Sequence, residues 1–82
     1  MATEVEEQLA YEQLRPYANS LPESQIFALD EGLNAGESYL ALSWLIADLL
    51  ENNIDVPKEL LLDAYNLLSN EDKEEYRELL PA

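Results

Sequence analysis

The segment from residue 36 to residue 53, GESYLALSWLIADLLENN, limits most strongly how this chain can fold. On a helical projection at about 100° per residue, its apolar side chains cover one wide face. This face consists of Tyr39, Leu42, Leu45, Ile46, Leu49 and Leu50. An apolar face this wide must be covered by several neighbouring elements. The segment therefore predicts a central helix that the rest of the chain packs around.

The opposite side of this helix is acidic and carries one aromatic residue. Glu37, Asp48 and Glu51 fall on a narrow stripe, and Trp44 lies among them. A rigid helix that presents a tryptophan between carboxylates is suited to binding a partner. The alternative is that the first helix of the chain covers the ring of Trp44, because tryptophan is largely buried in most small domains.

Two helices are expected before the central one. Thr3 and Glu6 have the spacing of a capping box for a helix to about Leu14, and Pro16 predicts a break or kink. Ser20 and Glu23 form a second candidate capping box, for a helix over residues 21–35. Gly36 is expected to end this helix in the left-handed conformation, so this helix and the central helix should form an antiparallel hairpin.

Two further helices are expected after the central one. Pro57 is placed to open a helix that reaches about Leu68, and Ser69 is placed to cap a short helix that ends at Leu80. No segment shows the sustained alternation of a strand. We therefore predict an all-α fold, a compact bundle of four to five short helices, with residues 1–82 as a single domain. The chain has no cysteine, so packing alone must stabilise it.

The charge of the chain is strongly negative, with 18 Asp and Glu against 4 Lys and Arg and a net charge of −14. No Lys or Arg occurs between Pro16 and Pro57, so the acidic residues of this segment have no basic neighbour in sequence. This pattern favours a positively charged partner and disfavours direct binding to nucleic acid. Solubility alone is the alternative explanation. With no membrane-spanning run and no export signal expected, we predict a cytoplasmic protein.

Catalysis is not expected, because the chain has neither histidine nor cysteine. These residues supply the commonest general base, the usual activated nucleophiles and most transition-metal ligand sets. The sequence also lacks the alternating oxygen ligands and turn glycine of a calcium loop. We therefore predict a protein that is not an enzyme and needs no cofactor or metal.

Over somewhat more than half of its length, the sequence resembles the small helical immunity proteins of the Maf type. The resemblance rests on Leu21-Pro22-Glu23, the Gly36-Glu37 turn, Leu40-Ala41-Leu42 with Leu45, and Asn53-Ile54-Asp55-Val56-Pro57. Proteins of that family accompany polymorphic and contact-dependent inhibition toxins. The resemblance implies a protein that binds and neutralises one cognate toxin domain, often a ribonuclease. The Tyr-Tyr-Pro motif of the colicin nuclease immunity proteins is absent, so none of their binding residues are carried over.

Three functions are consistent with these patterns. The first is an immunity protein that neutralises a basic nuclease toxin. The second is an acidic nucleic-acid mimic that regulates a DNA- or RNA-binding protein, and the third is a plain interaction module. For Phe27, which lies among acidic residues, we expect partial burial rather than a binding role. The predicted partner-binding residues are Asp30, Glu31, Glu37, Trp44, Asp48, Glu51 and Asp55.

Overall fold

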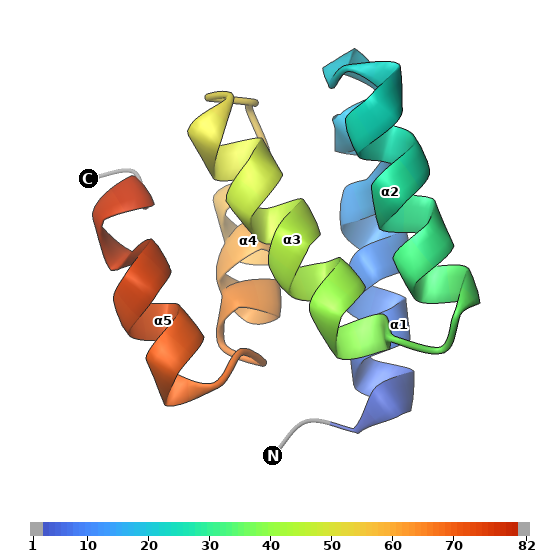
Figure 1. Cartoon of the computed structure of the whole chain (residues 1–82). Coiled ribbons are helices and arrows are strands. Elements are labelled where there is room, and N and C mark those ends of the chain that lie inside the picture. The colour runs from blue at the N-terminus through green and yellow to red at the C-terminus, as the bar shows by residue number, and fades with distance from the viewer. Residues whose placement is uncertain (1–2, 81–82) are drawn as a thin grey trace.

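Five α-helices and two 3₁₀ helices make up the computed structural model, which describes residues 3–80. They are α1 (Glu4–Leu14), η1 (Arg15–Ser20), α2 (Glu23–Asn34), α3 (Ser38–Glu51), α4 (Lys58–Tyr65), α5 (Asn70–Tyr76) and η2 (Arg77–Leu79) (Figure 1). Residues 3–80 contain no strand. The prediction of an all-α bundle is confirmed.

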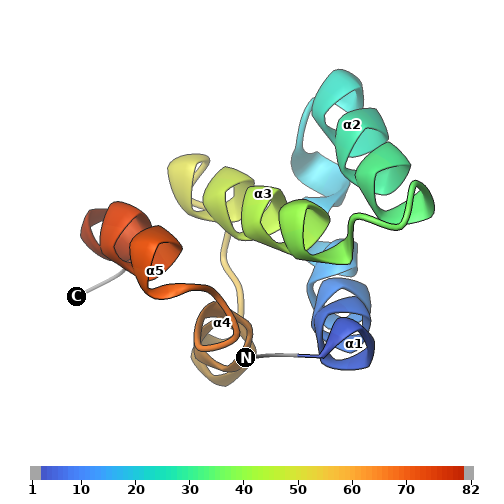
Figure 2. The ribbon, with the colours of Figure 1, turned by 60° about the horizontal axis from the view of Figure 1, so that its bottom comes forward.

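The helices form two layers, with α2, α3 and α5 in one layer and α1 and α4 in the other (Figures 1 and 2). Helix α3 lies in the middle of its layer and contacts α1, α2, α4, η1 and η2. The largest fully buried side chains are Tyr11, Leu14, Leu29, Leu42, Leu45, Ile46 and Leu49. Four of these seven belong to α3, so the apolar segment does form the centre of the core.

Side-chain caps set the starts of α1 and α5. The hydroxyl of Thr3 accepts a hydrogen bond from the Glu6 N–H at 3.2 Å, and the Glu6 carboxylate accepts one from the Thr3 N–H at 3.0 Å, so the first capping box is confirmed. The hydroxyl of Ser69 likewise accepts from the Asp72 N–H at the start of α5. As predicted at Pro16, α1 gives way to a different helix, η1.

The predicted capping box at Ser20 is wrong. Ser20 is the last residue of η1, and α2 starts after Pro22, with no side chain capping it. Leu21 between them is extended and buried, so the chain turns into α2 around a core contact. Two helix ends also differ from prediction, because α4 stops at Tyr65 and the last α-helix gives way to η2 after Tyr76.

Helices α2 and α3 end in the same way. Gly36 has a φ of +84°, the Glu37 N–H donates to the Gly32 carbonyl at 3.0 Å, and the Gly36 N–H donates to Leu33 at 3.1 Å. This pair of bonds defines a Schellman motif and confirms the left-handed end predicted at Gly36. Asn53 repeats the motif after α3, with a φ of 53°. The connection from α2 to α3 is consequently very short.

Helix α5 is attached to the other helices through hydroxyl groups and through Tyr76, which is partly buried and packs against the core. The Tyr39 hydroxyl donates to the Asp72 carboxylate at 2.6 Å, and the hydroxyls of Ser43 and Tyr76 lie 2.9 Å apart. The Tyr65 hydroxyl donates to the backbone carbonyl of Lys73. None of the residues of α5, Asn70–Tyr76, is itself buried.

As for membrane insertion, none of the helices within residues 3–80 combines the length and apolar character needed to cross a bilayer.

Candidate protein-binding surface

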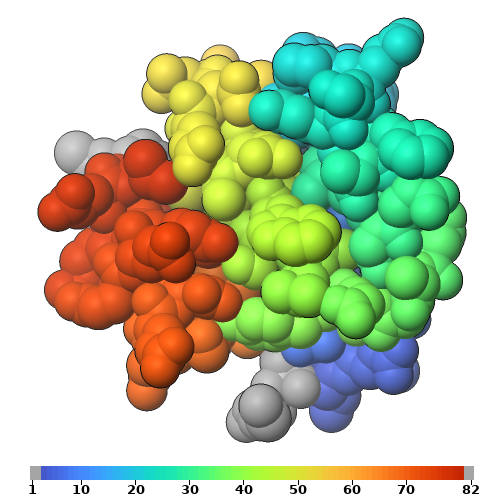
Figure 3. Space-filling model, viewed as in Figure 1, coloured from blue at the N-terminus to red at the C-terminus, as the bar shows by residue number. Residues whose placement is uncertain are grey.

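The outer face of α3 carries exposed apolar side chains at its centre. Trp44 is 45% exposed, and Leu40, one helical turn earlier, is 40% exposed. Figure 3 looks onto the layer to which this face belongs, with α3 between α2 and α5. Helix α1 lies in the other layer (Figure 2), and the 45% exposure of Trp44 shows that its ring is not fully covered. Trp44 is therefore available to a partner, in contrast to the seven largest fully buried side chains of the core.

A groove of about 400 Å³ runs between α2 and α3 beside this ring. Its walls are Ser24, Gln25, Ala28 and Leu29 from α2 and Trp44, Ala47, Asp48 and Glu51 from α3. Next to the groove, Gly32 of α2 lies beside Ala41 and Trp44 of α3. A Cβ atom at Gly32 would lie 3.6 Å from both the Ala41 Cβ and the Trp44 Cζ3 atoms.

Asp48 is the carboxylate that this groove partly buries. Burial, and secondarily the nearby charge of Glu51, raises the pKa of Asp48 above its ordinary value. No salt bridge to Asp48 is formed within residues 3–80. Gln25 also lines the groove, and its Oε1 atom is buried without a hydrogen-bond partner among the described residues. The groove therefore presents the carboxylate of Asp48 without a basic partner from residues 3–80.

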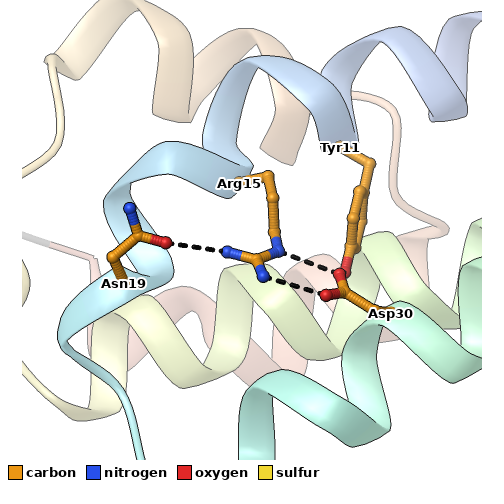
Figure 4. A network of polar contacts seen from close by, with 4 residues as sticks. All are labelled: Tyr11, Arg15, Asn19 and Asp30. Atoms are coloured by element: carbon orange, nitrogen blue, oxygen red, sulfur yellow. Dashed lines mark hydrogen bonds and ion pairs between the residues drawn. The ribbon is translucent and has the colours of Figure 1, made fainter. Parts of the chain in front are cut away.

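Asp30, by contrast, is not an unpaired carboxylate. The Arg15 Nε and Nη2 atoms donate to its two oxygens at 2.8 and 2.9 Å, and the Tyr11 hydroxyl donates to it at 2.8 Å (Figure 4). Arg15 also donates to the Asn19 side chain at 3.0 Å. The Arg15 guanidinium lowers the pKa of Asp30, and the Tyr11 hydrogen bond acts in the same direction. Asp30 therefore joins α2 to α1 and η1.

The other acidic residues predicted to bind a partner are exposed but do not form one cluster. Glu51 lines the groove with Asp48, whereas Glu37 immediately precedes α3 and Glu31 lies on α2. Asp55 lies in the connection between α3 and α4 rather than on a helix. Of the predicted site, the structure brings together Trp44, Asp48 and Glu51 in the groove.

The expectation that Phe27 is partly buried in the core is wrong. Its side chain is 68% exposed, whereas Leu29, two residues later, is 1% exposed. Two residues correspond to about 200° around a helix, so the two side chains point in nearly opposite directions. Phe27 and Glu31, one turn apart, mark an outer face of α2.

Sequence reasoning missed Gln25, Ala28 and Leu40. Gln25 and Ala28 lie on the side of α2 that faces α3. Their spacing from Leu29 and Gly32 indicates this side, but only once α2 and α3 are known to pack together. No group of His, Cys, Asp or Glu within residues 3–80 is arranged to hold a metal ion. The arrangement is suited to binding a protein surface that supplies donors and apolar contacts.

In comparisons with known proteins, no protein-family model, curated protein or solved structure matches the chain.

Proposed function

We propose that this chain is an immunity protein that binds a cognate basic toxin domain, a nuclease and most simply a ribonuclease, and neutralises it in the cytoplasm. The observation that carries the proposal is the exposed ring of Trp44 beside the carboxylates of Asp48 and Glu51, which form no salt bridge within residues 3–80. The resemblance to Maf-type immunity proteins supports the same function from the sequence.

Binding of a basic partner would be favoured by short-range contacts of the aromatic ring and by long-range electrostatic attraction. Aromatic residues at the centre of a protein interface often supply most of the binding energy, and polar residues around them exclude water. The net charge of −14 attracts a basic partner before contact and raises the association rate. A nuclease has a basic surface because it binds phosphates, so it is the kind of partner that this charge favours.

The exposed apolar side chains favour this function over nucleic-acid mimicry. A mimic of nucleic acid presents carboxylates in place of phosphates to a surface that is built for a charged backbone. On this protein Trp44, Leu40 and Phe27 are 45%, 40% and 68% exposed among the acidic residues. Such side chains are suited to apolar pockets on a folded protein.

The test starts from the genes next to that of this protein, where we expect a secreted protein with a C-terminal nuclease domain. RNA cleavage by that purified domain is measured with increasing amounts of the immunity protein, and inhibition complete at a one-to-one ratio is expected. Trp44→Ala should weaken binding by about 2 kcal/mol or more. The matched control is Val5→Ala, which removes a 64% exposed apolar side chain from α1 in the other layer. Cleavage that persists in an excess of the folded protein would show the proposal to be wrong.

A further inference from the structure

We propose that the groove between α2 and α3 receives an arginine side chain of the partner, with its guanidinium bonded to Asp48 and packed against the ring of Trp44. The inference rests on the proposed function, because the occupant belongs to the basic protein that this chain binds. It specifies which chemical group of that partner the groove recognises.

The first argument is that the groove offers carboxylates that have no basic partner. Asp48 and Glu51 line the groove, and neither forms a salt bridge within residues 3–80. A charged donor from another molecule would stabilise a partly buried carboxylate such as that of Asp48. A cation with several N–H groups therefore complements this groove.

The second argument is that the cationic side chains of the chain lie elsewhere. Arg15 is paired with Asp30 and Arg77 with Glu74, while Lys58 begins α4 and Lys73 lies on α5. These are the 4 basic residues of the sequence, and none of them lines the groove. A positive charge that meets Asp48 must therefore come from another molecule.

The third argument concerns shape. The small side chains of Ser24, Ala28 and Ala47 leave the groove open, and Trp44 forms part of its wall. Trp44 and Asp48 are four residues apart on α3, so they lie on the same face of the helix. A cation that bonds to Asp48 can consequently also contact the face of the indole ring, which attracts positive charge.

Arginine fits these features better than lysine. Its guanidinium is planar, presents five N–H donors in a fixed geometry and stacks on aromatic rings. Lysine offers a compact ammonium group that is strongly hydrated and does not stack. The groove combines several acceptors with an aromatic wall, which is the combination that a guanidinium satisfies.

The test needs no toxin, because Trp44 is the single tryptophan of the chain and its fluorescence reports on the groove alone. The probe is the blocked peptide acetyl-Gly-Arg-Gly-amide, compared with its lysine and citrulline counterparts. We expect the arginine peptide to change the Trp44 emission saturably, with a dissociation constant on the order of 1 mM. The citrulline peptide, which has the same shape without the charge, should have no effect. Equal responses to arginine and lysine, or no saturable response to arginine, would overturn the inference.

Two matched variants locate the bound peptide. Asp48→Asn should weaken binding of the arginine peptide by about fivefold or more, because it removes the charged acceptor. Asp63→Asn makes the same chemical change at an exposed position on α4 and should leave the affinity unchanged. An equal effect of both variants would mean that only net charge matters, and the groove would not be the site. Because Asp48 makes no salt bridge within residues 3–80, its substitution should not unfold the protein.

This experiment can fail independently of the proposed function. If the arginine peptide binds as expected but the toxin domain is not inhibited, the proposed function alone is wrong. If wild type and Asp48→Asn inhibit the toxin domain equally well, the assignment of the groove to arginine alone is wrong.

Discussion

At the scale of single residues, Phe27 and Leu29 show how two neighbouring apolar side chains differ in role. Phe27→Ala should lower the free energy of unfolding by less than about 1 kcal/mol, because little of the 68% exposed ring leaves water on folding. Leu29→Ala should cost about 2–5 kcal/mol, because it leaves a cavity at a position that is 1% exposed. Urea unfolding of both variants measures the difference. Similar losses for both would place Phe27 in the core after all.

The bidentate ion pair between Arg15 and Asp30 should make the stability of the fold depend on pH. The pKa of Asp30 is lowered in the folded protein, so its carboxylate stabilises the fold at neutral pH. This contribution is present above the unfolded-state pKa of about 4 and is lost as the pH falls through the lower folded-state value. Asp30→Asn should therefore cost about 1 kcal/mol at pH 7, a modest value because the pair is partly exposed.

The measurement for Asp30 is urea unfolding at a series of pH values. The stability of Asp30→Asn and that of the wild type should differ at neutral pH and converge in acid, where Asp30 itself is protonated. Glu31→Gln provides the control, since Glu31 is the exposed neighbour on the same helix. A difference between Asp30→Asn and wild type that stays constant down to strongly acidic pH would contradict the assignment.

The sequence predicts some of these residue roles and not others, for a physical reason. Trp44, Asp48 and Glu51 lie on one helix, so helical spacing alone places them together. The partner of Asp30 is 15 residues away in sequence and comes from another helix. Periodicity within α2 carries no information about such a contact, and the absence of basic residues between positions 16 and 57 does not reveal that Arg15 pairs with Asp30.

At the scale of helices, replacing each of the two glycines of the chain by alanine should change the free energy of unfolding in opposite directions. Gly32 lies within α2, and an added Cβ would be 3.6 Å from its nearest neighbours, which is ordinary contact. Gly32→Ala should therefore raise the free energy of unfolding by up to about 1 kcal/mol through helix propensity. Gly36 has a φ of +84°, so Gly36→Ala should lower it by about 1–2 kcal/mol. Thermal unfolding of the two variants tests both signs, and stabilisation by Gly36→Ala would contradict the left-handed turn.

Sequence signals for helix ends predicted the structure correctly where a single residue determines the local conformation. Thr3, Ser69 and Gly36 act through hydrogen bonds or dihedral angles within a few residues, and all three act as predicted. Ser20 did not, because η1 continues through it and buried Leu21 directs the chain into α2. The competing factor at Ser20 is a tertiary contact, which a capping pattern does not contain.

At the scale of the whole molecule, the net charge of −14 predicts the kinetics of association. With the toxin domain as partner, the association rate should fall by about 10-fold or more as salt is raised from low to high concentration, because ions screen the attraction. The dissociation rate should change much less, since it depends on short-range contacts such as those of Trp44. Stopped-flow measurements over a salt series test this. An association rate that is independent of salt would mean that the charge serves solubility only.

The attachment of α5 through hydroxyl groups has a consequence for motion. None of its residues is fully buried, and Tyr76 is the residue of α5 that packs, partly buried, against the core. Its contacts with Tyr39, Ser43 and Tyr65 include hydrogen bonds that water can replace. A segment with so little apolar burial opens at a lower free energy than the global unfolding of the protein. In native-state hydrogen exchange, the amides of α5 should therefore exchange well before those of α3. Detachment of α5 would expose Tyr39 and Ser43 to solvent on the side of α3 next to Trp44. Transient opening of the last helix would therefore enlarge the surface that is available to a partner.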